Sequence, residues 1–149
     1  MAYRHILVPT DGSARSRRAV AVALRLAAAV GARVTGFYAV AEGVPTLFSG
    51  DKLYGSGVMS REYRNLAKRE AQDRLAQLGR QAAAAGVPCR TVWRLARDPW
   101  RAILRAARAG GCDLIVMGSH GRGGVQTVLL GSQAVKVLAH SKIPVLVCR

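Results

Sequence analysis

The sequence predicts a single doubly wound α/β domain, and two observations lead to that prediction. Near-continuous apolar runs alternate along the chain with segments in which apolar side chains recur at helical spacing. Apolar runs of this kind are typical of parallel strands that are buried on both faces. Right-handed crossovers between such strands place helices on both faces of the sheet. Because the 149 residues contain no internal repeat and no linker, we expect one domain over residues 1–149.

The beginning of the chain is predicted to contain two strands joined by a helix. An apolar run over residues 3–8 ends in Pro9-Thr10-Asp11-Gly12-Ser13, a group of turn and cap formers. Apolar residues recur at helical spacing over 16–30, and Gly31 ends that helix. The second strand is predicted over 33–40.

Residues 43–59 have no clear period and contain four glycines, two serines and a proline. A structureless loop of this length is uncommon inside a compact domain. It could be a lid or a tolerated surface excursion, and the sequence does not decide between the two.

The rest of the chain continues the alternation of helices and strands. The predicted elements are a helix over 60–85, a strand over 89–95, a helix from 98 to Gly110-Gly111, a strand over 113–117, a helix over 132–140 and a strand over 143–148. Asp98 is predicted to cap its helix, with Pro99 in the first turn, and Ser132 to cap the last helix. Leu66 of the long helix, and Val135 and Leu138 of the last helix, are expected to pack inward.

The charge of the chain is strongly positive. Its 23 Lys and Arg against 8 Asp and Glu give a formal charge of +15 at pH 7. Either the surface is merely basic and solvated, or the partner is an anion such as a nucleotide, a nucleic acid or an acidic lipid. Charge alone does not choose between these.

The composition also predicts a reduced, cytoplasmic protein. Cys89, Cys112 and Cys148 form no CxxC pair and have no nearby His, so we expect packing rather than a metal site or disulfides. No apolar run approaches the ~18–20 residues that cross a membrane. The apolar stretch near the N-terminus is too short for a signal peptide.

A glycine-rich loop follows the strand over 113–117. It carries Gly118 and Gly121, and Gly131-Ser132 then opens the last helix. Strand, bare backbone and helix N-terminus together are typical of phosphate binding. Glycine leaves room for a phosphate to reach backbone N–H groups. Neither GxxxxGK[ST] nor a GxGxxG after the first strand is present, so P-loop and dinucleotide chemistry are not indicated.

The loop after the first strand has ligand-binding character as well. In open parallel sheets, ligands bind at the carboxyl ends of the strands where the strand order reverses. If the first and fourth strands are neighbours there, both loops face one crevice. His120, within the glycine-rich loop, is interpreted as a loop-stabilising or exposed residue.

These residues carry a resemblance to a known family. Gly118-x2-Gly121-x9-Gly131-Ser132 resembles the signature of the ATP-binding branch of the universal stress protein family. Residues 6–13, Asp98-Pro99, 113–118 and 143–147 are similar to further family segments, in the expected order. The resemblance implies a five-stranded parallel sheet of order 3-2-1-4-5. It also implies ATP, possibly with Mg²⁺, at the junction of the first and fourth strands, and usually a homodimer.

The same resemblance implies the residues that hold the nucleotide. Asp11 would hold the ribose, although it could instead be only a helix cap. Arg122 could touch a phosphate or simply be solvated. The implied cofactor-binding set is Pro9, Thr10, Asp11, Ala39, Val40, Met117, Gly118, Gly121, Arg122, Gly131, Ser132 and Gln133.

The function predicted on this basis is an ATP-binding regulatory protein of the stress response. No carboxylate or lysine is well placed to activate water, so we predict no catalytic residues and at most slow ATP hydrolysis. One alternative is a basic nucleic-acid-binding protein. Another is an adenylate-forming enzyme of related fold, although Thr10-Asp11-Gly12-Ser13 lacks the serine- and glycine-rich pyrophosphate loop that such enzymes need.

The last strand has an apolar edge that would be exposed in a monomer. Such an edge invites pairing with another strand. We therefore expect a homodimer through Val145, Leu146 and Val147, as the family resemblance also suggests. No membrane partner is predicted.

Overall fold

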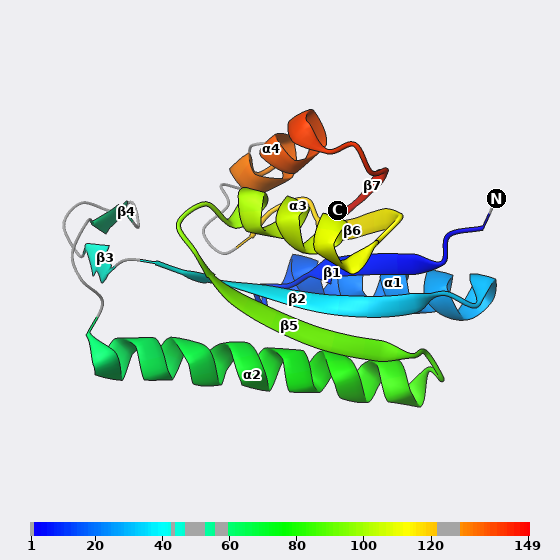
Figure 1. Cartoon of the computed structure of the whole chain (residues 1–149), viewed down its shortest axis with the longest axis horizontal. Coiled ribbons are helices and arrows are strands. Elements are labelled where there is room, and N and C mark those ends of the chain that lie inside the picture. Colours follow the sequence, from blue (N-terminus) through cyan, green and yellow to red (C-terminus); the bar gives the residue numbers. More distant parts are fainter. Residues whose placement is uncertain (1, 43, 47–52, 56–59, 122–128) are drawn as a thin grey trace.

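A five-stranded parallel sheet forms the centre of the protein (Figure 1). The structure, a computed structural model, describes residues 2–42, 44–46, 53–55, 60–121 and 129–149. The strands of the sheet are β1 (His5–Pro9), β2 (Arg33–Ala41), β5 (Cys89–Ala96), β6 (Leu114–Gly118) and β7 (Val145–Cys148). Their order is β5-β2-β1-β6-β7, and every pairing is parallel. Counted as the five predicted strands, this is the order 3-2-1-4-5, so the predicted sheet is confirmed.

The strand order reverses between β1 and β6. From β1 the chain proceeds to β2 and then β5 on one side, and it returns to β6 and β7 on the other side. Ile6 and Leu7 of β1 pair in parallel with Leu114 and Ile115 of β6. The loops that follow these two strands therefore leave the sheet side by side, at the position where open α/β sheets bind ligands.

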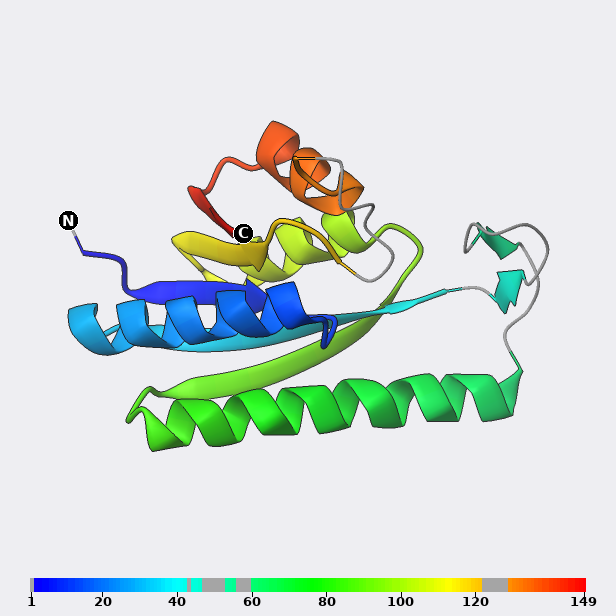
Figure 2. The ribbon, with the colours of Figure 1, turned by 180° about the vertical axis from the view of Figure 1, so that it is seen from behind.

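Helices cover both faces of the sheet, as predicted. They are α1 (Ala14–Val30), α2 (Arg61–Ala84), α3 (Pro99–Gly110) and α4 (Ser132–His140). Ile6 and Val8 of β1 pack in one core cluster with residues of α1 and α2. The intervening Leu7 packs in a second cluster with residues of α3 and α4. Figure 2, seen from behind, shows α1 lying along the sheet.

Local hydrogen bonds fix the helix ends. The hydroxyl of Ser13 accepts from the Ser16 backbone N–H at 3.2 Å, and Ser60 does the same for Tyr63 at 3.2 Å. Gly31 ends α1 in the left-handed conformation at φ 69°, which glycine adopts without steric cost. The first helix thus begins at Ala14, two residues before the predicted start.

Two short strands lie within the predicted 43–59 loop. β3 (Val44–Thr46) pairs with β4 (Leu53–Gly55) in an antiparallel hairpin. Strands of three residues are too short to show a period, so the sequence pattern did not reveal them. Residues 43, 47–52 and 56–59 of that predicted loop lie outside the described residues.

Three inward-facing predictions were wrong. Leu66 is 64% exposed because it lies in the first part of α2, and the buried residues of this helix start only at Ala71. Val135 and Leu138 of α4 are 48% and 41% exposed. Ala134, which was also expected to pack inward, is buried, and Val137 is the second buried residue of this helix.

The three cysteines are free thiols, as predicted. Cys112 is buried, whereas Cys89 and Cys148 are half-buried. Burial raises the pKa of Cys112 to about 11, which leaves its thiol protonated and unreactive at neutral pH. Among the described helices, none is both long and apolar enough to cross a lipid bilayer.

Candidate functional site

A pocket of about 410 Å³ lies at the carboxyl ends of β1, β2 and β6. It extends between the first part of α2 and the beginnings of α3 and α4. The structure brings together in its lining the predicted residues Pro9, Thr10, Asp11, Ala39, Val40, Met117, Gly118, Gly121, Gly131, Ser132 and Gln133. Arg122 lies outside the described residues.

The β1–α1 loop is braced by its own side chains. Asp11 Oδ1 accepts a hydrogen bond from the Ser13 backbone N–H at 2.9 Å, which closes a tight turn. Thr10 Oγ1 accepts from the Gly12 N–H at 3.2 Å and lies 3.1 Å from Ser16 Oγ. Because Ser13 is the cap of α1, Asp11 is a turn residue and not the helix cap.

Gly121 brings the glycine-rich loop against the β1–α1 loop. A Cβ atom at position 121 would lie 2.7 Å from Asp11 Oδ2, closer than real Cβ contacts. Only glycine therefore lets this loop approach the Asp11 carboxylate so closely. The two loops that the sequence nominated do face one crevice.

The other two glycines of the motif make room for the protein's own backbone. A Cβ at Gly118 would lie 3.1 Å from the backbone C and O of Arg15 in α1. A Cβ at Gly131 would lie 3.1 Å from His120 Cα and Ser119 O. The expected reason for glycine, room for a phosphate, is thus incomplete, because these glycines let the loop pack against α1 and against the start of α4.

The cap of α4 lies one residue before the predicted position. Gly131 is the N-cap, with φ −71° and ψ 158°, and its N–H donates to Ser119 O at 2.7 Å. Its carbonyl accepts from the Val135 N–H at 3.0 Å. Ser132 is the first helical residue, and it is exposed.

The first turn of α4 is directed at the pocket. Ser132, Gln133 and Ala134 all line it. The N–H groups at the start of a helix have no partner within that helix and carry partial positive charge. This end of the pocket can therefore bind an anion through backbone donors and the Ser132 hydroxyl.

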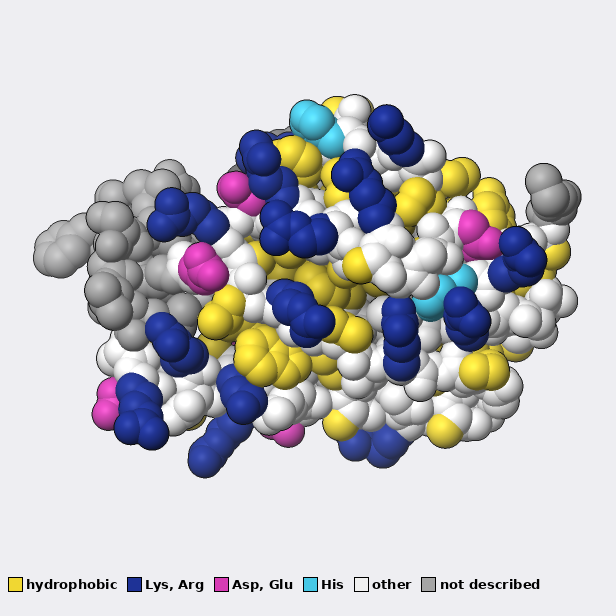
Figure 3. Space-filling model, viewed as in Figure 1, with side chains coloured by type: hydrophobic (Ala, Val, Ile, Leu, Met, Phe, Trp, Pro, Cys, Tyr) yellow, Lys and Arg dark blue, Asp and Glu magenta, His cyan; other side chains and the backbone are white. Residues whose placement is uncertain are grey.

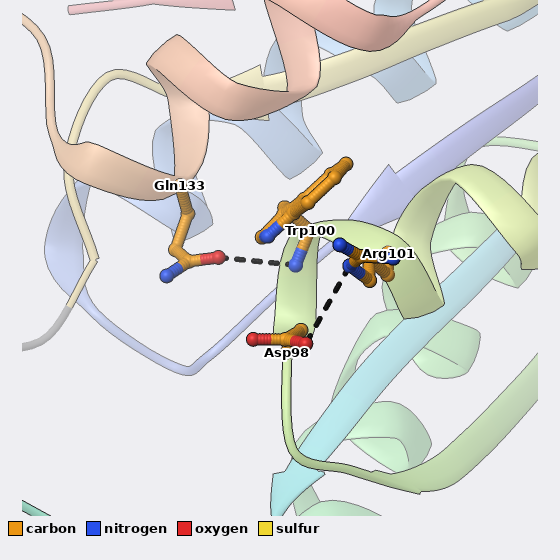
Figure 4. Close-up of polar contacts among 4 residues, drawn as sticks. All are labelled: Asp98, Trp100, Arg101 and Gln133. Atoms are coloured by element: carbon orange, nitrogen blue, oxygen red, sulfur yellow. Dashed lines mark hydrogen bonds and ion pairs between the residues drawn. The ribbon is translucent and has the colours of Figure 1, made fainter.

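Gln133 has a structural contact as well (Figure 4). Its Oε1 accepts from the Trp100 backbone N–H in the first turn of α3 at 3.0 Å. Asp98 occupies the N-cap position of α3 but forms no cap hydrogen bond. The predicted N-cap position of Asp98, with Pro99 in the first turn, is confirmed, but its carboxylate pairs with Arg101 Nε at 3.5 Å. Gln133 of α4 supplies the hydrogen bond to the first turn of α3.

Sequence reasoning missed two parts of the pocket wall. Tyr63, Ala67 and Glu70 of α2 line it, together with Tyr38 of β2. The three α2 residues have the spacing of an ordinary amphipathic helix, so no signal in the sequence pointed to them. Ser119 and His120 also line the pocket and are only 2% and 7% exposed, whereas His120 had been interpreted as loop-stabilising or exposed.

The lining offers two chemically different kinds of surface. Phe37, Ala39, Ile103 and Met117 provide apolar surface, whereas the donors lie at the start of α4. Such a division suits a ligand with one flat apolar part and one anionic part. In the ranges that the structure describes, His, Cys, Asp and Glu side chains form no group of three or more that could hold a metal ion.

Comparisons with known proteins agree on one family. The model of the universal stress protein family matches residues 2–149. A universal stress protein of Thermus aquaticus is 37% identical over 148 residues, 99% of each chain. Universal stress protein UspA from Lactobacillus plantarum superposes with a TM-score of 0.81 at 25% identity, over 100% of this chain and 99% of its own. A universal stress protein solved in complex with cAMP superposes with a TM-score of 0.72 at 28% identity, over 100% and 99%.

Proposed function

This chain belongs to the universal stress protein family, and on that premise we propose that its pocket binds ATP. We further propose that the protein regulates a stress response as a homodimer and hydrolyses ATP slowly at most. The observation that carries the proposal is the crevice at the strand-order reversal, where Gly121 meets Asp11 beside the start of α4.

The lining supports a definite orientation of the nucleotide. Adenine would lie against the apolar surface of Ala39, Val40 and Met117, with the ribose at Asp11. The phosphates would then reach the first turn of α4 and the Ser132 hydroxyl, where helix N–H groups favour negative charge. A volume of about 410 Å³ lies within the range of small-molecule sites.

One related structure supports a nucleotide as the class of ligand. The protein solved with cAMP shares the fold and 28% of its sequence with this chain. The ligand cAMP contains an adenine and a phosphate. In this pocket, the adenine would lie on the apolar surface and the phosphate at the start of α4.

The residues present fit a Mg²⁺ ion that binds together with the nucleotide phosphates. Asp11 and Glu70 are the carboxylates of the described lining. Mg²⁺ commonly takes one or two carboxylates together with phosphate oxygens and water, so the nucleotide would supply a large share of its ligands. The ion would neutralise phosphate charge at the pocket.

Slow hydrolysis follows from what the lining offers. Within the described part of the pocket, the lining contains no Lys or Arg that could stabilise a transferring phosphoryl group. We therefore expect turnover well below about 1 s⁻¹, the lower end of the ordinary enzyme range.

The homodimer would form along β7. This strand lies at one end of the sheet and pairs there with β6. Leu146 is 40% exposed, while Val145 and Val147 are packed against the α3–α4 cluster. Antiparallel pairing of two β7 strands would give the unpaired backbone N–H and C=O groups of this edge hydrogen-bond partners. It would also cover Leu146.

Substitution of Ser132 tests the pocket without disturbing the fold. The glycines are unsuitable because a Cβ at Gly118 or Gly131 would meet protein backbone. Ser132 is exposed and is not the N-cap of α4, so Ser132→Ala should leave the melting temperature unchanged. Its loss of a phosphate contact should weaken ATP binding by about tenfold in calorimetry. Ser132→Thr keeps the hydroxyl and is the matched control.

The outcomes of this test separate clearly. Weaker ATP binding by Ser132→Ala with near-normal binding by Ser132→Thr supports the assignment. Equal affinity for ATP in wild type and both variants would place the phosphates elsewhere.

A further inference from the structure

His120 contributes a buried nitrogen that the protein leaves unpaired. The side chain is 7% exposed and lines the pocket. Its Nδ1 lies 3.1 Å from Ser119 Oγ, but its Nε2 has no hydrogen-bond partner among the described residues. A buried polar atom without a partner destabilises the protein, so one that persists in a pocket points to a ligand atom.

The imidazole lies beside the first turn of α4. A Cβ at Gly131 would lie 3.1 Å from His120 Cα and 3.5 Å from its ring atom Cδ2. The Gly131 N–H is already bound to Ser119 O at 2.7 Å, which fixes the loop against the helix. His120 and the first turn of the nine-residue α4 are therefore neighbours in the lining of the pocket.

The contact with Ser119 is compatible with the tautomer that a phosphate requires. Ser119 is only 2% exposed, and its hydroxyl can donate to Nδ1 or accept from it. If the hydroxyl donates, the imidazole carries its proton on Nε2, and this N–H has no partner among the described residues. A fully ionised phosphate has oxygen acceptors and no donor. A bound phosphate therefore selects the tautomer that carries its proton on Nε2.

We propose that His120 Nε2–H donates a hydrogen bond to a phosphate oxygen and thereby makes the pocket selective for nucleotides over nucleosides. Ser119 acts as a positioning residue that holds the imidazole through Nδ1. This inference rests on the proposed function, because it names the group that recognises the phosphate of the same ligand. The α4 donors attract any anion, whereas the single Nε2–H adds a directed contact that adenosine cannot use.

Two substitutions test the two nitrogens of the imidazole separately. In His120→Asn the amide lies near the position of Nδ1, so the Ser119 contact is kept and the Nε2 donor is lost. In His120→Gln the amide reaches the position of Nε2 and keeps a donor there. His140→Asn, an exposed histidine at the end of α4, is the matched control.

The experiment is calorimetric titration of AMP and adenosine into each full-length variant. We expect His120→Asn to weaken AMP binding by about tenfold or more while adenosine affinity changes less than about twofold. His120→Gln and His140→Asn should bind AMP nearly as wild type does. In ¹⁵N-histidine spectra of the wild type, the Nε2 resonance should shift with AMP and not with adenosine.

Other results would overturn the inference. If His120→Asn binds AMP like wild type, Nε2 meets no phosphate, and a buried water is then its partner. An equal loss of AMP and adenosine would make the residue purely structural. If the wild type binds AMP but prefers adenosine, nucleotide binding survives and the selectivity does not. A wild type that binds no adenine ligand overturns the proposed function itself.

Discussion

His5 is a buried histidine at the end of the sheet opposite the pocket. Its Nε2 lies 2.8 Å from Thr35 Oγ1, and Arg90 Nε donates to the same oxygen at 2.9 Å. Burial lowers the pKa of His5 below its ordinary value of 6.5, and the charges of Arg33 and Arg90 lower it further. The backbone of Gly110 and the carboxylate of Asp113 oppose this shift without cancelling it.

This lowered pKa predicts an acid-sensitive component of stability. Below pH 6.5 the unfolded chain binds a proton at His5 that the folded chain still excludes, so the free energy of unfolding falls as the pH drops from 6.5 toward the folded pKa. Above pH 6.5 His5 is neutral in both the folded and the unfolded state, so its titration does not change the free energy of unfolding. Urea unfolding from pH 8 to pH 5 measures the effect.

The variant His5→Gln should remove this component and give a flatter pH profile than wild type. His140→Gln, which removes an exposed histidine, should keep the wild-type slope. Identical slopes for His5→Gln and wild type would show that other groups cause the acid sensitivity.

At several single residues, the structural role could not be predicted from the sequence. The spacing of Gly118, Gly121 and Gly131 led to their assignment to the site. The structural reason why these positions need glycine was predicted only in part. A Cβ at two of them meets the backbone of Arg15 or of Ser119 and His120, and these contacts between distant segments are not visible in a motif. His120 was assigned no ligand-binding role for the same reason, since its contact with Gly131 joins two segments that are separated in the sequence.

Among the elements, α3 and α4 are linked at the edge of the pocket. Gln133 of α4 accepts from the first turn of α3, and the Trp100 ring lies 4.5 Å from the His140 ring, centroid to centroid. The existence of both helices was predictable from Pro99 and from helical periodicity. Their relative rotation was not, because a cross-helix cap leaves no local pattern, and this is why Val135 and Leu138 were assigned to the wrong face of α4.

The β7 edge gives a prediction at the scale of elements. Leu146→Asp should convert the proposed dimer to a monomer, because two paired β7 strands would bring carboxylates together in a dry interface. Leu146 is 40% exposed, so the folded monomer can hold the aspartate in water. Sedimentation velocity measures the change in mass.

Leu66→Asp is the control for this substitution. Leu66 is 64% exposed on α2, at the other side of the sheet from β7. This variant should sediment like the wild type. A dimer that persists in Leu146→Asp would require another interface.

For the whole molecule, the alternation of apolar runs and helical periods was enough to predict the architecture. Continuous burial of β1 and β6 produces those runs, and the parallel pairing follows from the crossovers. The order of the strands came from the family resemblance, since periodicity carries no information on which strands are neighbours. The α2 wall of the pocket could not be predicted, because it depends on where a long helix lies relative to the strand ends.

The positive charge is spread over the face of the molecule that Figure 3 shows. Figure 3 shows Lys and Arg side chains spread across the visible face rather than gathered at one place. A spread of this kind favours weak, salt-dependent attraction of polyanions over a built nucleic-acid site. The nucleic-acid-binding alternative therefore has less support than a nucleotide in the pocket.

The measurement that tests the central claim most directly is the nucleotide content of the freshly purified protein. Protein is denatured, and the released small molecules are identified by mass spectrometry and quantified against the protein. The account predicts an adenine nucleotide in the wild type, less of it in Ser132→Ala, and rebinding of added ATP by the stripped protein. A wild type that releases no adenine nucleotide and binds no added ATP in calorimetry would contradict it.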